Sequence, residues 1–330
     1  MTTLSPAVPL LDVRNLHVSF STPDGVLEAV RGISFSVDKG KVLGIVGESG
    51  SGKSVATQAM VGLVRGAQVA GTAVFEGRNL LQLPPDELRA IRGRGIAMIF
   101  QNPISSLHPL YRVGWQIVEM IRTHESMTKR QARSRAIELL GLVGIPRPDR
   151  RIDDYSHQFS GGMLQRAMIA MALALNPRLL VADEPTTALD VTVQAQILQL
   201  LRRIRREFGM AVILITHDLG VIAEIADDVV VMYAGQALEV ASCRDLFRTP
   251  RHPYTCGLLQ SIPREDGECN QLTPIRGQPP SAIAPPPGCP FHPRCAYAIE
   301  RCQTETQLLA PPAGAANHRC ACWWREEAQP

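Results

Sequence analysis

The chain has no cysteine before Cys243, no long apolar run and no marked excess of either charge. Its apolar runs, such as "MIAMALAL", are far shorter than the ~20 residues that span a bilayer as a helix. The first thirty residues lack a basic segment followed by an apolar one, so we expect no secretory signal. A net charge of +3, carried by scattered basic residues, gives no indication of nucleic acid binding. These absences predict a cytosolic protein whose cysteines stay reduced.

Short apolar strands and amphipathic helices alternate along the 330 residues, which suffice for one large domain or two modest ones. Strands are expected at residues 10–20, 28–37, 41–47, 70–77, 95–101, 178–184, 210–218 and 227–235. Helices are expected at residues 113–124, 128–144 and 191–208, where apolar residues recur at three and four. This alternation predicts a largely parallel sheet that is covered on both faces. From about residue 245 the chain becomes rich in proline, which indicates an extended tail.

The stretch "GESGSGKS" follows the apolar run "KVLGIV" and precedes a predicted helix, which is the context that the phosphate-loop pattern G-x-x-x-x-G-K-S/T requires. Glycines let the backbone curl so that successive N–H groups and the helix N-terminus face a phosphate chain. Lys53 is expected to reach the β and γ phosphates, and the Ser54 hydroxyl to ligate Mg²⁺. The residues expected to contact nucleotide are Gly47, Ser49, Gly50, Ser51, Gly52, Lys53 and Ser54.

A second acidic motif, "RLLVADEP", follows the predicted strand at residues 178–184. The strand would deliver Asp183 to the Mg²⁺ shell at its carboxyl end. Glu184 would then polarise a water for attack on the γ-phosphate. The alternative for such a pair is that it caps the following helix. The phosphate loop upstream favours the catalytic interpretation.

The stretch "FSGGMLQRAMIAMALALNPRLLVADEPTTALD" strongly resembles the ATP-binding subunits of ABC transporters, because a signature-like "FSGGMLQR" lies one short helix before the acidic strand. "IFQNP", "TTALD" and "ILITHD" resemble the Q-loop, the D-loop and the strand before the switch histidine of that family. The resemblance covers residues 10–260 and implies site roles for Gln101, Asp190 and His217. It also places Gln101 in the Mg²⁺ shell and Phe20 where the family has an aromatic that stacks on adenine.

The resemblance implies a composite site between two subunits. Signature residues of one subunit would contact the γ-phosphate of ATP held by the other, so that ATP closes the dimer and hydrolysis loosens it. Partial positive charge at a helix N-terminus favours such an anion. The residues implied here are Ser160, Gly161 and Gly162.

The implied fold is an α/β P-loop NTPase core of the ABC type with an antiparallel β subdomain. The core would comprise residues 1–102 and 178–245. An α-helical signature subdomain would occupy residues 103–177, and a C-terminal extension rich in proline and cysteine would occupy residues 246–330.

Three further stretches, "STPDGVLEAV", "DVTVQAQIL" and "RTPRHPYTCGLL", look like the ATPase subunits of bacterial dipeptide and oligopeptide importers. That resemblance implies ATP and Mg²⁺ as cofactors. It implies as partners a second ATPase subunit, usually a paralogue in this branch, two transmembrane permeases and an extracytoplasmic peptide-binding protein, with no direct contact to nucleic acid. The chain would attach to the cytoplasmic face of the membrane through the permeases. Import of a nickel complex or haem, and a soluble non-transport ABC ATPase, are the alternatives.

The cysteines of the tail follow the spacing Cys289-x5-Cys295-x6-Cys302, with Cys320-x-Cys322 further on. Structural zinc sites usually use closer pairs, and the spacing is not a common ferredoxin pattern. From spacing alone, an iron–sulfur cluster, zinc and unligated thiols all stay open. The peptide-importer resemblance favours a 4Fe–4S cluster, with Cys322 as fourth ligand and Cys320 as runner-up. Its expected role is to fasten a tail that has too little apolar content to form a core, while Cys243, Cys256 and Cys269 are expected to be ordinary thiols.

Overall fold

The computed structural model describes residues 8–187, 189–261, 275–311 and 318–323, and the chain divides into two compact units. Unit 1 comprises residues 1–83 and 214–330, and unit 2 comprises residues 84–213. Strand β8 (Ala211–Thr216) carries the chain from unit 2 back into unit 1. Within the described ranges, no helix combines the length and apolar character that crossing a membrane requires. The expected partition into core, helical subdomain and extension stays a prediction.

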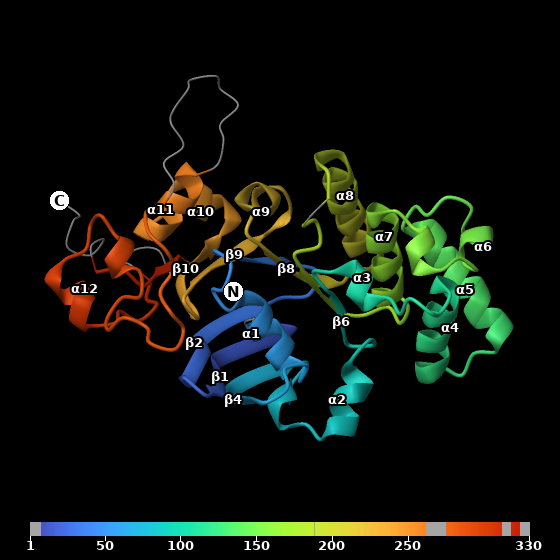
Figure 1. Ribbon diagram of the computed structural model, residues 1–330, viewed down its shortest axis with the longest axis horizontal. Helices are drawn as coiled ribbons and strands as arrows, with labels where there is room; N and C mark the ends of the chain where they lie inside the picture. The colour runs from blue at the N-terminus through green and yellow to red at the C-terminus, as the bar shows by residue number, and fades with distance from the viewer. Residues whose placement is uncertain (1–7, 188, 262–274, 312–317, 324–330) are drawn as a thin grey trace, which may run out of the picture. The chain divides into compact units, whose positions relative to one another are not determined.

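One sheet of unit 1 is antiparallel, with the order β2-β1-β4-β5 (Figure 1). Its strands are β1 (Leu11–Thr22), β2 (Gly25–Val37), β4 (Ala67–Phe75) and β5 (Arg78–Asn79). Leu11, Val13 and Leu16 of β1 are fully buried, and an irregularity in the register lies between Val13 and Leu16. Helix α1 (Lys53–Met60) packs against β1 and β2, and a short 3₁₀ turn, η1 (Leu80–Gln82), follows β5. This sheet confirms the expected antiparallel layer.

The other sheet portion of unit 1 has the order β11-β10-β9-β3. Strand β3 (Val42–Val46) runs parallel to β9 (Asp228–Tyr233), and every residue of β3 is buried. Strands β10 (Gln236–Ser242) and β11 (Arg319–Cys320) continue the sheet antiparallel. Helices α9 (Leu219–Ile225) and α10 (Cys243–Arg248) lie beside these strands. A continuous apolar strand of this kind is typical of a parallel sheet covered on both faces.

The described C-terminal extension is built from short elements: α11 (Pro253–Gln260), η3 (His292–Arg294), α12 (Glu300–Thr304) and β11. Tyr254 and Phe291 are buried, and their rings lie 4.7 Å and 5.4 Å from that of Tyr233 at the end of β9. The extension thus buries two aromatic rings of its own against Tyr233 of β9. The expectation that its low apolar content prevents a core of its own stays a prediction.

Unit 2 is mainly helical. Its strands β6 (Ile96–Ile99) and β7 (Leu179–Asp183) pair in parallel. The helices are α2 (Pro85–Ile91), α3 (Pro103–Ser106), α4 (Val113–His124), α5 (Lys129–Leu142), α6 (Pro148–Arg151), α7 (Gly161–Ala172) and α8 (Val191–Phe208), with a 3₁₀ turn η2 (Ser156–Gln158). Helices α4, α5 and α7 pack together through apolar side chains such as Ile117, Leu139 and Ile169, which have no exposed surface. The helices expected at 113–124, 128–144 and 191–208 are confirmed.

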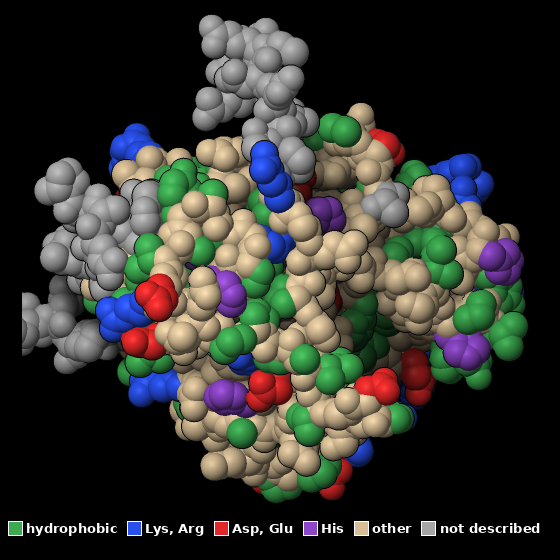
Figure 2. Space-filling model, turned by 60° about the vertical axis from the view of Figure 1, so that its left-hand side comes forward, with side chains coloured by type: hydrophobic (Ala, Val, Ile, Leu, Met, Phe, Trp, Pro, Cys, Tyr) green, Lys and Arg blue, Asp and Glu red, His purple; other side chains and the backbone are tan. Residues whose placement is uncertain are grey.

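Figure 2 shows one face of the molecule, on which described Lys, Arg, Asp and Glu side chains are dispersed among neutral and apolar ones. On this face, positive and negative side chains lie among one another and do not form a broad field of one sign. This distribution agrees with the small net charge of +3.

Candidate nucleotide-binding site

The phosphate loop joins β3 to α1 in unit 1, in the strand–loop–helix order that the sequence predicts. Gly50 and Gly52 adopt positive φ angles of +78° and +93°, which side chains rarely tolerate. A Cβ on Gly52 would lie 2.3 Å from the Ala29 carbonyl oxygen, and one on Gly47 would lie 2.1 Å from that of Met232. The glycines therefore allow the loop to curve and let its backbone approach the neighbouring strands closely.

Lys53 is the first residue of α1, and its side chain turns back over the loop. Its ammonium group donates to the carbonyl oxygens of Gly47 and Glu48, both at 2.8 Å, and lies 3.3 Å from Ser51 Oγ. With 5% of its surface exposed, the side chain is held inside the loop. Ser49 is exposed, Ser51 is buried and Ser54 is half-buried. The predicted phosphate-binding residues are thus gathered in one loop.

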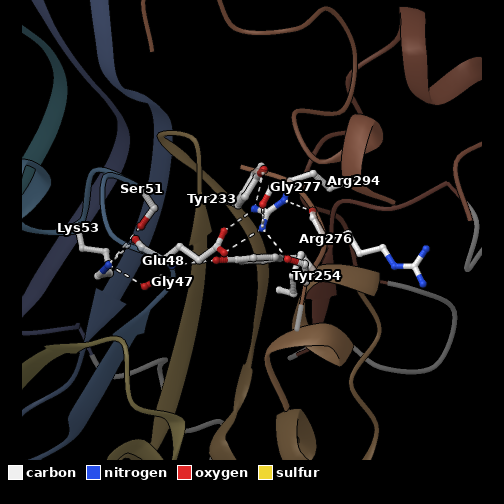
Figure 3. Close-up of polar contacts among 10 residues, drawn as sticks. Gly47, Glu48, Ser51, Lys53, Tyr233, Tyr254, Arg276, Gly277 and Arg294 are labelled. Atoms are coloured by element: carbon white, nitrogen blue, oxygen red, sulfur yellow. Dashed lines mark hydrogen bonds and ion pairs between the residues drawn. The ribbon is translucent and has the colours of Figure 1, made fainter. Parts of the chain in front are cut away.

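Glu48 also contacts two residues from the C-terminal extension. Its backbone N–H donates to the Tyr254 hydroxyl at 2.9 Å. Its carboxylate receives two bonds from the Arg294 guanidinium, at 2.6 and 3.1 Å (Figure 3). Sequence reasoning missed both partners, because the motif pattern leaves the Glu48 position unspecified and Arg294 lies 246 residues away.

In unit 2, Asp183 ends the buried strand β7, and Glu184 follows it. Asp183 is 2% exposed. Glu184 has φ of +46°, a left-handed backbone that costs a residue other than glycine about 1–3 kcal/mol and is often found at functional sites. The cap of the next helix, α8, is Asp190, whose carboxylate accepts from the Val193 N–H at 2.9 Å. The capping alternative for the Asp183–Glu184 pair is therefore wrong.

Two predicted site residues of unit 2 are brought together by a hydrogen bond. The Gln101 amide donates to Glu184 Oε2 at 2.8 Å, and the Thr187 hydroxyl donates to the same oxygen at 2.8 Å. Sequence reasoning assigned Gln101 and Glu184 separately and missed Thr187, which lies in the "TTALD" stretch. Both donors bond to the same oxygen, Oε2, and together they fix the orientation of the Glu184 carboxylate, the expected base.

The signature stretch begins α7 of unit 2. Ser160 caps this helix by accepting from the Met163 N–H at 3.4 Å, and Gly161 and Gly162 are its first two residues. Ser160 and Gly161 are exposed, so the N-terminus of α7 is open to solvent. A Cβ on Gly162 would lie 2.9 Å from Val193 Cγ1, which explains a glycine where α7 meets α8.

The remaining predicted residues lie at element ends or in a strand. His217 is exposed between β8 and α9, and Asp190 is exposed at the start of α8. Phe20 is half-buried in β1, opposite Leu27 and Ala67 of the neighbouring strands. The half-buried ring is compatible with stacking and equally with ordinary packing.

The cysteines of the extension lie close to one another. Burial, together with the nearby thiols Cys302 and Cys322, raises the pKa of Cys289 and Cys295 to about 11. A hydrogen bond to Cys322 and burial raise the pKa of Cys320 well above its usual range. The seven described cysteines form no disulfide with one another, and Cys269 lies outside the described residues.

No three of the described His, Cys, Asp and Glu side chains are arranged around a single metal ion. Gly288 brings the backbone together here, because its φ is +70° and the Cys289 N–H donates to the Cys302 carbonyl at 2.9 Å. Thiols are the donor type that an iron–sulfur cluster requires.

A buried polar group holds the extension to β10. Glu239 has no exposed surface and accepts from the N–H groups of Arg251 and His252 and from His318 Nε2 at 2.6 Å. Burial alone would raise the pKa of Glu239, but the His318 bond and the backbone bonds lower it below its usual value. Burial lowers the pKa of His252 to about 4, so this side chain is neutral near pH 7.

Comparison with known proteins agrees with this geometry. A family model described as ABC transporter matches residues 30–187, and one described as oligopeptide/dipeptide transporter, C-terminal region, matches residues 238–302. The oligopeptide transport ATP-binding protein OppD of Haemophilus influenzae is 49% identical over 97% of this chain and 98% of its own length. The dipeptide transport ATP-binding protein DppD of Bacillus subtilis is 49% identical over 96% of this chain and 95% of its own.

Solved structures agree in fold. The dimeric ATP-binding cassette MJ0796 bound to ADP and Pi has a TM-score of 0.65 and 27% identity, covering 71% of this chain and 99% of its own. The cassette cbiO1 of Clostridium perfringens has a TM-score of 0.62 and 26% identity, covering 73% and 91%. The two transport proteins are about half identical to this chain over nearly its whole length. The protein therefore belongs to the oligopeptide and dipeptide family of ABC transporters, in which it is the importer subunit that binds and hydrolyses ATP.

Proposed function

We propose that the phosphate loop holds the phosphates of ATP while Glu184 polarises the attacking water. The exposed loop amides and the Lys53 ammonium supply the positive field that a triphosphate requires. Lys53 now bonds to carbonyl oxygens of its own loop, and bound phosphates would replace these acceptors. The Glu184 carboxylate, fixed by Gln101 and Thr187, would then accept a proton from water.

Mg²⁺ would be bound by the Ser54 hydroxyl, Gln101 and the Asp183 carboxylate. Asp183 fits this role because its buried carboxylate ends strand β7 and because Mg²⁺ prefers oxygen donors. When bound, the ion would neutralise charge that develops on the phosphates. His217 would contact the γ-phosphate, and Phe20 would stack on the adenine.

The open N-terminus of α7 supports a composite site. Ser160, Gly161 and Gly162 would face the γ-phosphate of a nucleotide held by a second cassette, since helix-end N–H groups favour an anion. Asp190 would lie at the same interface. ATP would then bind between two cassettes, and its hydrolysis would weaken their contact.

The transported solute is proposed to be a dipeptide or oligopeptide. The observation that carries this proposal is the match of residues 238–302 to the C-terminal region of oligopeptide and dipeptide transporters, which generic cassettes would not need. The partners would be a second ATPase subunit, two transmembrane permeases and an extracytoplasmic binding protein. The chain would then work at the cytoplasmic face of the membrane, attached through the permeases.

The extension is proposed to carry a 4Fe–4S cluster on Cys289, Cys295, Cys302 and Cys322, with Cys320 as the alternative fourth ligand. The mutual proximity of these thiols supports the proposal. The cluster would act as a structural crosslink. Iron and sulfide in equal amounts, with a brown colour, are expected in anaerobically purified protein, and stoichiometric zinc without iron would overturn this assignment.

The experiment that tests the ATPase assignment is Glu184→Gln. The variant should bind ATP as the parent does, lose turnover by about 10²–10⁴-fold and accumulate as a closed dimer. Turnover at the parent rate would show that another group is the base. Uptake of labelled peptide by the chain with its permeases and binding protein tests the solute, and uptake of a nickel complex or haem alone would contradict it.

A further inference from the structure

We propose that Arg294 of the C-terminal extension is a positioning residue for the phosphate loop, acting through Glu48, so that docking of the extension sets the affinity for ATP. The proposal rests on the assignment of this loop as the ATP site. It assigns a function to Arg294, a residue that lies outside the cassette motifs.

Arg294 is buried and fully engaged. Its side chain is 5% exposed. Two of its nitrogens contact the two carboxylate oxygens of Glu48 at 2.6 and 3.1 Å. The remaining donors bond to the Tyr233 hydroxyl at 3.2 Å and to the carbonyl oxygens of Arg276, Ile275 and Gly277 at 2.8, 3.3 and 3.2 Å. A planar guanidinium can make this set of bonds, whereas a lysine ammonium cannot.

The contacts continue from Glu48 into the loop (Figure 3). The Glu48 N–H donates to the Tyr254 hydroxyl, and the Glu48 carbonyl accepts from the Lys53 ammonium at 2.8 Å and from the Ser51 N–H at 3.3 Å. Arg294 therefore lies two bonded steps from the lysine that would bind the phosphates. Figure 3 shows Glu48 between Lys53 on one side and Arg294 on the other.

Residues 275–282 of the extension, which include the carbonyl groups that Arg294 binds, also contact strand β2. The Glu28 N–H of β2 donates to the Ala282 carbonyl at 3.1 Å, and Pro279 and Pro280 line a small cavity together with Glu48 and Ser49. The segment that Arg294 holds through its carbonyl bonds thus packs directly on the loop. Loss of the guanidinium would leave Glu48 buried in part without its counter-charge and release both contacts.

The test measures Mg·ATP binding to the full chain by titration calorimetry, which separates affinity from the fraction of active protein. Arg294→Gln should weaken binding about tenfold at unchanged stoichiometry. Arg294→Lys should recover only part of the affinity, because it keeps the charge but loses the paired geometry. Glu48→Gln should also weaken binding, and the double variant should be no weaker than the worse single variant.

Arg14→Gln is the matched control, because Arg14 also pairs with a carboxylate in unit 1, at 2.7 Å, but is 76% exposed. It should leave affinity within twofold. In turnover assays, Arg294→Gln should raise the KM for ATP about tenfold with kcat within twofold. If Arg294→Gln does not fold, Glu48→Gln and Arg294→Lys decide the question by the same measurement.

If a folded Arg294→Gln variant bound Mg·ATP as tightly as the parent chain does, the proposal would be overturned. A loss of binding stoichiometry at unchanged affinity, which a merely structural role would produce, would overturn it too. Additive losses in the double variant would also contradict an action of Arg294 through Glu48. A parent chain that binds no Mg·ATP, by contrast, would refute the assignment of the ATP site itself and not this coupling.

Discussion

The phosphate loop and the C-terminal extension are held in place by different kinds of interaction. The loop depends on glycines and backbone groups, because a Cβ on Gly47 or Gly52 would collide with a neighbouring carbonyl oxygen. The extension depends on large side chains, with Tyr254 and Phe291 packed against Tyr233. Phosphate chemistry restricts which residues can form the loop, whereas many combinations of side chains could anchor an extension. The sequence of the first region therefore indicates its function much more directly than that of the second.

The two regions nevertheless meet at Glu48. Arg294 pairs with the Glu48 side chain and the Tyr254 hydroxyl accepts from the Glu48 N–H, so the extension contacts the phosphate loop directly. The extension is also fixed to β10 through Glu239 and His318. Several independent contacts therefore hold the extension against the rest of unit 1.

The largest expected effect comes from removing one of the buried aromatic rings of the extension. Phe291→Ala removes a ring that is 3% exposed, and should lower the free energy of unfolding by about 4 kcal/mol through the cavity it leaves. Chemical unfolding and limited proteolysis of the extension measure this. Leu308→Ala, at a side chain that is 82% exposed, is the control and should change stability by less than about 0.5 kcal/mol. Equal stability of both variants would show that the aromatic rings do not hold the extension.

The next prediction compares two glycines of the loop. Gly52→Ala places a Cβ 2.3 Å from the Ala29 carbonyl oxygen at a residue with positive φ. It should lower the free energy of unfolding by about 3–4 kcal/mol and abolish ATP binding. Gly50→Ala meets no atom within 4 Å and carries only the strain of φ +78°, about 1–2 kcal/mol. Unfolding and nucleotide titration of the pair check this difference. Similar losses in both would mean that close packing is not what the loop requires.

The smallest expected effect is on the pH dependence of stability. The pKa of His252 is about 4 in the folded chain, against about 6.5 when unfolded. Between these values the unfolded state binds more protons, so stability should fall by up to about 3 kcal/mol as pH falls from 6.5 to 4. His252→Asn keeps a side-chain oxygen able to cap α11 but cannot titrate. Its unfolding free energy should depend less on pH in this window, and an unchanged slope would contradict the assignment.

The phosphate loop, the acidic strand end and the signature helix could be predicted because each needs particular residues at fixed local spacing. Gly52, Asp183 and Ser160 lie in the local settings that the sequence indicates. The Arg294–Glu48 pair could not be predicted, since no local pattern links residues 246 positions apart. Thr187 was missed because a hydroxyl in a loop has many ordinary partners. The cysteine spacing left several ligands open, because sequence separation does not determine how four thiols meet in space.

The most direct test of this account is amide hydrogen exchange of the phosphate loop in the full chain. If the extension holds the loop through Arg294, the amides of Glu48 and Ser51, which donate to the Tyr254 hydroxyl and to the Glu48 carbonyl, should exchange faster in Arg294→Gln than in the parent. They should exchange at the parent rate in Arg14→Gln. Exchange that is the same in all three proteins would contradict the claim that the extension positions the loop.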